Sequence, residues 1–197
     1  MASFEEILII KPGAIGDLLQ ITPVIRAIRR TLPEARITML VGNRASVDLF
    51  RHNAEVHDCI VFDKRGEHRH FSGFWKLWRR IRAGRFDLVI NFQRSNLKAW
   101  LLVAAALPCR ILVYHKARNR DVHAVVNHLE TLAPLGIGAD DTALEFHPGP
   151  EAERYAENLF LESGLTGRIV IALNPGASHP VNRWGTRAFR TSSRRTG

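Results

Sequence analysis

The 197-residue chain lacks long apolar runs. A helix that spans a bilayer needs about 20 mostly apolar residues in a row, whereas the longest apolar stretch here, residues 99–108, is shorter and ends in a proline. Residues 1–6 carry glutamates where a signal peptide carries Lys or Arg. We therefore expect a cytoplasmic protein without a transmembrane helix.

Cysteine is also scarce, which argues against a disulfide framework. The two cysteines, Cys59 and Cys109, each adjoin aliphatic residues of an expected strand. That setting is typical of small core residues in a reducing compartment. Of the nine histidines, only His68 and His70 are closely spaced. We expect neither a disulfide nor a metal site.

Acidic residues are nearly missing from two stretches, and the formal net charge is +9. Residues 182–197 contain five arginines and no acid, and residues 64–85 contain eight Lys or Arg against one Glu. Such patches attract phosphate groups, although a solvated helix face has the same composition. A nucleic-acid partner would rest on net charge alone, because no nucleic-acid-binding motif is present, and we expect none.

Aliphatic strand patterns alternate with helical ones along most of the chain. Expected strands are residues 7–10, 36–41, 56–62, 86–91 and 110–113, and expected helices are one from Leu18 that Pro33 stops, then 45–52, 71–83, 96–106 and 122–135. Continuous aliphatic runs such as residues 7–10 indicate strands buried on both faces. The alternation predicts an α/β fold, a doubly wound and mostly parallel sheet covered on both sides.

A cluster of prolines and a glycine at residues 147–150 indicates a domain boundary. We assign residues 1–148 to one complete Rossmann-like domain and residues 149–197 to the incomplete beginning of a second. The second part opens with a helix at 151–163 and an expected buried strand at 168–173. Residues 186–197 have no apolar periodicity and are expected to be a disordered tail.

The first candidate binding loop, Lys11-Pro12-Gly13-Ala14-Ile15-Gly16-Asp17, connects a strand to a helix. Loops at the carboxyl ends of parallel strands face the crevice where α/β proteins bind ligands. Glycines allow close backbone approach, and a helix N-terminus suits anionic groups. Asp17 can be read either as the N-cap of the helix or as a catalytic carboxylate.

The second candidate loop, residues 174–184, follows the expected strand at 168–173. Its small residues, hydroxyl group and cation are what a diphosphate cradle requires, although an ordinary strand-to-helix turn has the same residues. The two loops together indicate an interdomain cleft, where ligands often bind.

These segments resemble glycosyltransferase family nine, the ADP-heptose:lipopolysaccharide heptosyltransferases. The matching stretches are ILIIKPGAIGDLLQITPVIRAIRRTLPEARITMLV, FDLVINFQRSNLKAWLLVAAALPCRI, LAPLGI and RIVIALNPGASHPVNRW. The opening Gly-x-x-Gly-Asp with its Thr-Pro-x-x-Arg-x-x-Arg helix is fairly specific. The resemblance implies a GT-B fold of two Rossmann-like domains, with the donor nucleotide held mainly by the C-terminal one.

The resemblance also implies an inverting, metal-independent transfer without a cofactor, in which Asp17 is the general base. The substrates would be a nucleotide-sugar donor, ADP-heptose, and a lipopolysaccharide core or lipid A-type acceptor. Donor or substrate contacts are expected from Gly13, Ala14, Gly16, Gly176, Ala177, Ser178, Asn182 and Arg183. Asn182 and Gly185 stand where the family usually has Lys and Pro.

The helix at residues 71–83 carries aromatic and basic side chains. It can be read as a contact with a phosphorylated lipid acceptor at the inner face of the inner membrane, or as a helix that packs its aromatics on the sheet. Residues assigned to acceptor or membrane contact are Lys11, Trp75, Trp78, Arg79 and Arg80.

We therefore expect a glycosyltransferase that moves a heptose or related sugar onto a lipopolysaccharide core, in a polypeptide that has no transfer activity by itself. The alternative is a non-catalytic, flavodoxin-like fragment that binds a ligand or a membrane surface.

Overall fold

The computed structural model describes residues 4–93, 97–115, 122–138, 141–174, 176–177, 181 and 183. The chain divides into two compact units, Met1–Gly149 and Pro150–Gly197. The roles expected for the two parts stay predictions.

The N-terminal unit is built on a five-stranded parallel sheet with the strand order β3-β2-β1-β4-β5. The strands are β1 (Glu6–Ile10), β2 (Arg36–Val41), β3 (Asp58–Val61), β4 (Leu88–Asn91) and β5 (Arg110–Val113). The chain starts in the centre of the sheet and winds outward on both sides of β1. This arrangement confirms the predicted doubly wound α/β fold.

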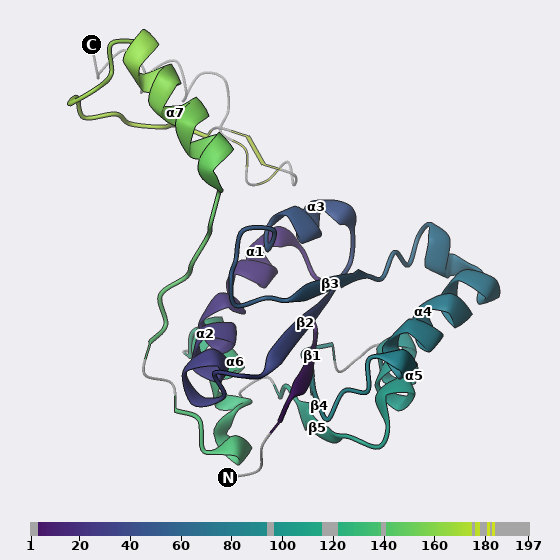
Figure 1. Cartoon of the computed structure of the whole chain (residues 1–197). Coiled ribbons are helices and arrows are strands. Elements are labelled where there is room, and N and C mark those ends of the chain that lie inside the picture. The colour runs from purple at the N-terminus through teal and green to yellow at the C-terminus, as the bar shows by residue number, and fades with distance from the viewer. Residues whose placement is uncertain are drawn as a thin grey trace. The chain divides into compact units, whose positions relative to one another are not determined.

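Helices cover both faces of the sheet (Figure 1). They are α1 (Ile15–Leu19), α2 (Thr22–Thr31), α3 (Arg44–Asp48), α4 (Phe71–Ala83), α5 (Leu97–Ala106) and α6 (Ala124–Glu130), with short 3₁₀ turns at Glu67–Arg69 and Ala133–Leu135. Helices α2 and α6 lie over one face, and α4 and α5 lie over the other. None of the helices in the described part of the chain is long and apolar enough to cross a membrane.

The central strand supplies apolar side chains to two cores at once. Ile7 and Ile9 join the cluster under α2 and α6, while Leu8 and Ile10 join the cluster under α4 and α5. Successive side chains of a strand point to opposite faces, so a strand in the middle layer must be aliphatic at every position. The uninterrupted run at residues 7–10 is therefore a direct consequence of two-sided burial.

The helix expected from Leu18 to Pro33 is two helices, α1 and α2, because Pro23 interrupts it. Proline lacks the N–H that would continue the helical hydrogen bonds to the carbonyl four residues earlier. The carbonyl of Leu19 is satisfied instead by the hydroxyl of Thr22, which donates to it at 2.8 Å. This break leaves α1 as a short helix of its own.

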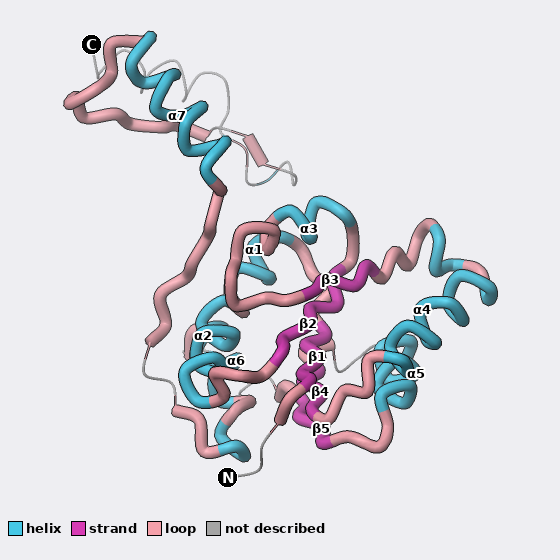
Figure 2. Tube along the Cα trace, viewed as in Figure 1, coloured by secondary structure: helices cyan, strands magenta, loops and turns pink. Residues whose placement is uncertain are grey.

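The second unit contains the helix α7 (Pro150–Glu162), as predicted, but the strand expected at residues 168–173 is not formed. Its aliphatic side chains are solvent-exposed, with 96% exposure at Ile169 and 69% at Ile171. The segment is loop in Figure 2. A parallel strand needs a neighbour for its backbone N–H and C=O groups, and the described residues of this unit include no other strand.

Candidate functional site

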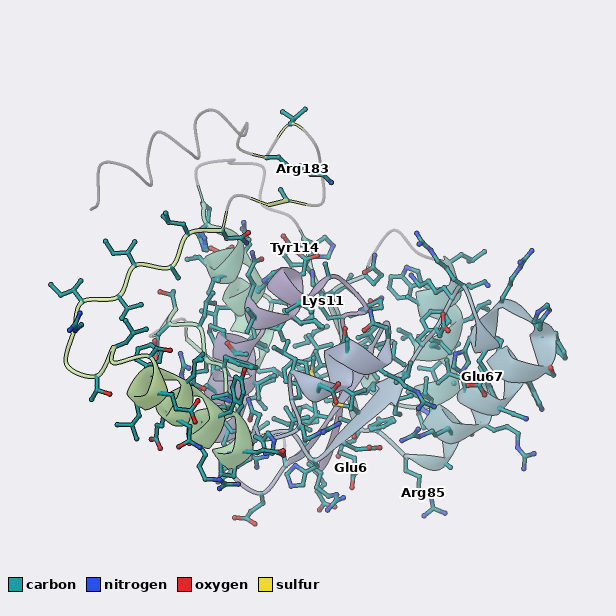
Figure 3. The ribbon with its side chains drawn as sticks, turned by 90° about the horizontal axis from the view of Figure 1, so that it is seen from above. Glu6, Lys11, Glu67, Arg85, Tyr114 and Arg183 are labelled. Carbon is teal, nitrogen blue, oxygen red and sulfur yellow. The ribbon has the colours of Figure 1, made fainter. Side chains whose placement is uncertain are left out.

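The candidate site of the N-terminal unit lies at the carboxyl edge of the sheet, where β1, β4 and β5 end side by side. Lys11 follows β1, Phe92 follows β4 and Tyr114 follows β5. The register pairs Ile10 with Asn91 across β1 and β4, so these strands end at the same level. Figure 3 views the chain from above, with Lys11 and Tyr114 labelled. This edge is where parallel α/β sheets bind ligands.

The loop from Lys11 to Asp17 is held by backbone contacts and close glycine packing. The backbone N–H of Lys11 donates to the carbonyl of Leu40 at 3.1 Å, which extends the β1–β2 ladder by one bond. A Cβ on Gly42, just after β2, would lie 2.3 Å from the Pro12 carbonyl oxygen. Only glycine allows this approach, so the loop is fixed against the neighbouring strand end.

Gly13 makes room for the Asp17 side chain. A Cβ at Gly13 would lie 2.9 Å from Oδ2 of Asp17, so the carboxyl group sits over the bare glycine backbone. At Gly16, by contrast, an added Cβ would meet nothing within 4 Å. The two glycines of the motif therefore differ: Gly13 lies against the Asp17 side chain, whereas Gly16 has open space where a side chain would be.

Asp17 is not the N-cap of the helix, so that reading of the sequence was wrong. Ala14 occupies the cap position of α1, without a side-chain hydrogen bond, and Asp17 lies in the first helical turn. The chain enters α1 three residues earlier than an Asp17 cap would require, since the cap lies at residue 14. Asp17 is exposed, so its carboxylate is accessible to a ligand over the sheet edge.

Three ionisable groups, on Lys11, Asp17 and His128, influence one another at this edge. Partial burial lowers the pKa of Lys11, and the charge of Asp17 opposes that shift. Burial lowers the pKa of His128 to about 4, helped by the Lys11 ammonium. A hydrogen bond with the backbone of Gln20 and the charge of Asp17 act in the opposite direction. His128 is therefore neutral near pH 7, and Lys11 supplies the positive charge next to Asp17.

Two aromatic rings, those of Phe92 and Tyr114, pack against the imidazole of His128. His128 is 3% exposed. The centroid of its imidazole lies 5.2 Å from that of Phe92, in an edge-to-face arrangement, and 4.9 Å from that of Tyr114. Burial also raises the pKa of Tyr114. Nδ1 of His128 and Nδ2 of Asn91 are buried without a hydrogen-bond partner among the described residues.

Sequence reasoning identified Lys11 and Asp17 but missed His128, Tyr114 and Asn91. The position of Asn91 at the end of a buried strand was an available signal, because that end faces the ligand crevice. His128 lies within an ordinary amphipathic helix pattern. Its neighbours Phe92 and Tyr114 are distant in sequence, so no local pattern marks it.

In the second unit, the described part of the candidate donor loop folds back on itself. The side chain of Arg183 donates from Nε to the carbonyl of Ala177 at 2.6 Å, and the N–H of Gly176 donates to the Asn174 side chain at 3.1 Å. Ser178 and Asn182 lie outside the described residues. A role for this loop in donor binding stays a prediction.

Helix α4 divides its aromatic side chains between the core and the surface, so the reading that it packs its aromatics on the sheet holds in part, and the contact with a lipid acceptor stays a prediction. Leu77 and Ile81 are buried against the sheet, and Phe74 and Trp78 pack partly against the same core. The expected packing of the aromatics on the sheet is wrong for Phe71 and Trp75, which are exposed, because they lie on a different face of the helix from the buried Leu77 and Ile81.

The exposed aromatics form a stacked row. The rings of Phe71 and Trp75 stack with their centroids 6.3 Å apart. Those of Trp75 and Trp78 stack with their centroids 5.0 Å apart and 2° between their planes. Arg79, Arg82 and Arg85 line a surface hollow together with the two tryptophans. Arg80 points elsewhere and pairs with Asp58 at 2.9 Å, which makes it a structural link between α4 and β3.

No group of three or more His, Cys, Asp or Glu side chains is placed to hold a metal ion in the described part of the chain.

Comparison with known proteins relates the chain to lipopolysaccharide heptosyltransferases. No protein-family model matches it. It is 27% identical over 140 residues to lipopolysaccharide heptosyltransferase 3 of Escherichia coli K12, covering 62% of this chain and 40% of that protein. A second Escherichia coli lipopolysaccharide heptosyltransferase 3 is 22% identical over 194 residues, which cover 88% of this chain and 55% of that protein. The chain thus spans about half the length of the curated relatives it matches.

Solved structures give the same result for the fold. The glycosyl transferase family 9 protein of Veillonella parvula DSM 2008 superposes with a TM-score of 0.81 at 24% identity, over 97% of this chain and 59% of that one. Escherichia coli ADP-heptose lps heptosyltransferase II superposes with a TM-score of 0.71 at 18% identity, over 97% of this chain and 61% of that one. Over the part that it spans, the chain is similar in sequence to lipopolysaccharide heptosyltransferases and shares its fold with glycosyl transferase family 9 structures.

Proposed function

We propose that this chain is the acceptor-side part of an inverting, metal-independent glycosyltransferase that moves a heptose or related sugar from a nucleotide-sugar donor to a lipopolysaccharide core acceptor. The observation that carries the proposal is the placement of Asp17: an exposed carboxylate over Gly13, beside Lys11, at the carboxyl edge of a parallel sheet. Its sequence relatives are lipopolysaccharide heptosyltransferases, which supports the sugar and the acceptor, and the name of the structural relative ADP-heptose lps heptosyltransferase II supports the donor.

In this reaction Asp17 acts as general base. Its carboxylate accepts the proton of the acceptor hydroxyl while that oxygen forms a bond to the anomeric carbon. The bond from the anomeric carbon to the nucleoside diphosphate breaks with its electron pair, and the diphosphate leaves. A carboxylate at this position also stabilises the positive charge that develops on the sugar. The nucleotide-sugar is a substrate, and we expect no further cofactor.

Lys11 contributes a cation that binds anionic groups of the acceptor. A partly desolvated ammonium interacts more strongly with a phosphate or carboxylate than a fully hydrated one, because less water screens it. The neutral His128 beneath it adds no second cation near Asp17. The arrangement therefore separates the two tasks, with anion binding at Lys11 and proton transfer at Asp17.

The donor side of the proposal concerns the loop with Gly176, Ala177, Ser178, Asn182 and Arg183. We assign it to the diphosphate by resemblance, and ADP is the nucleotide bound to one structural relative, Escherichia coli heptosyltransferase WaaC, which superposes with a TM-score of 0.56.

We further propose that α4 brings the protein to the inner face of the inner membrane, where its lipid acceptor lies. The row Phe71, Trp75 and Trp78 provides aromatic rings for the headgroup region, and Arg79 and Arg85 provide charge for anionic lipids. Aromatic rings are favoured at this depth because one edge is apolar and the other tolerates water.

Vesicle binding tests the membrane proposal. The double variant Arg79→Glu/Arg85→Glu should lose most binding to phosphatidylglycerol vesicles, and wild-type binding should fall as salt rises. The control Arg36→Glu/Arg51→Glu changes the net charge equally at exposed positions outside α4. Equal loss in both double variants would show that only net charge matters and would reject a surface specific to α4.

Transfer itself is tested with the chain joined to the C-terminal domain of a family 9 relative. With ADP-heptose and a heptose-free lipid A–Kdo acceptor, we expect the acceptor mass to increase by one heptose, with inversion at the anomeric carbon and no effect of EDTA. Binding of either substrate without any transfer by the soluble extended chain would favour the alternative, a non-catalytic binding domain.

A further inference from the structure

Residues 141–149 form neither helix nor strand (Figure 2), yet three of them, Asp141, Ala143 and Glu145, bond to side chains of α2. The N–H of Glu145 donates to the Thr22 hydroxyl at 3.0 Å, and the carbonyl of Ala143 accepts from Nη2 of Arg26 at 2.8 Å. The N–H of Ala143 donates to the side chain of Asp141 at 2.9 Å. These bonds satisfy the two backbone groups of Ala143 and the N–H of Glu145, and two of the three join the segment to α2.

Arg26 is the centre of these contacts. Its side chain is only 8% exposed and forms ion pairs with Asp141 at 2.9 Å and with Glu145 at 2.6 Å. A buried guanidinium is unfavourable unless acceptors surround it. Within the described part of the chain, the acceptors of Arg26 are the Asp141 and Glu145 carboxylates and the Ala143 carbonyl, all from residues 141–145. The burial of Arg26 and the position of the segment therefore depend on each other.

The contacts on α2 follow one stripe of the helix. Thr22, Arg26 and Arg30 are four residues apart and share a face, and Arg30 adds a pair with Asp141 at 3.5 Å. Ile25 and Ile28 are buried in the core instead. The Thr-Pro-x-x-Arg pattern of the sequence thus has a local explanation, because the threonine and the arginine hold the same distant segment.

The segment ends at a position that only glycine can occupy. Gly149 has a φ of +85°, and a Cβ there would lie 2.4 Å from the His52 ring. The chain is therefore pressed against His52 in a left-handed conformation, which side chains rarely adopt. The next residue, Pro150, begins α7.

We propose that Thr22, Arg26 and Arg30 form a clamp that makes residues 141–149 a fixed part of the N-terminal unit. The clamp extends the fixed part of the N-terminal unit to Gly149 and makes Arg26 a positioning residue. Arg26 contacts neither substrate in this proposal; it determines the point from which the chain leaves the N-terminal unit. Its role in transfer rests on the proposed function, whereas the clamp itself does not.

Hydrogen exchange of the 197-residue chain tests the clamp. Arg26→Met should speed amide exchange at Ala143 and Glu145 at least tenfold and leave β1 and β4 unchanged. Arg29→Met is the matched control, because Arg29 lies on the same helix but bonds to the Pro33 and Glu55 carbonyls instead. Unchanged exchange at Ala143 and Glu145 in Arg26→Met would overturn the clamp.

A second variant covers the case in which Arg26→Met unfolds the core. Asp141→Asn/Glu145→Gln removes the two carboxylates from the segment and leaves α2 intact, and it should give the same local increase in exchange. If this variant keeps the wild-type exchange pattern, the clamp is refuted whatever Arg26→Met does.

Kinetics of the extended chain test the positioning role separately. We expect Arg26→Met to lower kcat while KM for the acceptor stays unchanged, and Arg26→Lys to restore part of kcat. A wild-type kcat in Arg26→Met would refute the positioning role. If the wild-type extended chain transfers no sugar, the proposed function fails, and the exchange experiment still decides the clamp.

Discussion

Replacing His128 with glutamine should make the stability of the protein less sensitive to acid. The pKa of His128 falls from 6.5 to about 4 in the folded protein, first because of burial and then because of Lys11. In the unfolded chain the imidazole binds a proton once the pH drops below about 6.5. The stabilisation from the neutral imidazole is therefore complete above pH 6.5 and is lost as the pH falls toward 4.

The size of the effect follows from the shift of the pKa. A change from 6.5 to about 4, at about 1.4 kcal/mol for each pH unit, gives an upper limit of about 3 kcal/mol. At pH 5 the folded imidazole is still mostly neutral while the unfolded one is protonated, so about 2 kcal/mol is already lost. Glutamine does not titrate in this pH range, so the variant should not lose this contribution of about 2 kcal/mol to the free energy of unfolding.

Urea unfolding at pH 7 and pH 5, followed by tryptophan fluorescence, measures this difference. The free energy of unfolding of the wild type should fall by about 2 kcal/mol more than that of His128→Gln. Val125→Ala, on the same helix, is the control: it removes apolar volume and should lower stability by about 1.6 kcal/mol at both pH values. If the free energy of unfolding of the wild type differs from that of His128→Gln by the same amount at both pH values, His128 is not a buried neutral histidine.

Two further substitutions or modifications probe the site and the core. Gly42→Ala should lower the free energy of unfolding by about 1–3 kcal/mol, since its methyl group would lie 2.3 Å from the Pro12 carbonyl oxygen, whereas Gly16→Ala meets nothing within 4 Å and serves as the control in urea titrations. Burial raises the pKa of Cys59 to about 11, so mass spectrometry should find slow alkylation of this thiol at pH 8 in the native protein and fast alkylation in urea. Equal rates in both states would contradict a buried thiol.

The sequence was most informative where burial alone determines the residue type. The run Ile7-Leu8-Ile9-Ile10 must be aliphatic because it lies between two cores, and this requirement can be read directly from the residues. The same logic failed at residues 168–173, which have an equally aliphatic pattern but no neighbouring strand in the described residues. An aliphatic pattern shows that a segment can form a strand, but the strand forms only where a neighbouring strand is present to pair with it.

The site was predictable only in part, for a similar reason. Asp17 and Lys11 belong to one short loop, so their proximity follows from local sequence. The capping position of Asp17 was wrong because the helix starts at Ile15. His128 and Tyr114 reach the site through the order of strands and helices, and the contacts of Arg26 with residues 141–145 join positions more than 100 residues apart. Such contacts depend on topology and leave no periodic pattern.

The most direct test of the central claim is the transfer rate of Asp17→Asn in the extended chain. Asparagine keeps the size of the side chain but cannot accept the acceptor proton, so kcat should fall by about 10²–10⁴-fold with KM for the acceptor nearly unchanged. Lys11→Met should instead raise KM for the acceptor and affect kcat less. If Asp17→Asn retains a kcat close to that of the wild type, Asp17 is not the general base and the account of this site is wrong.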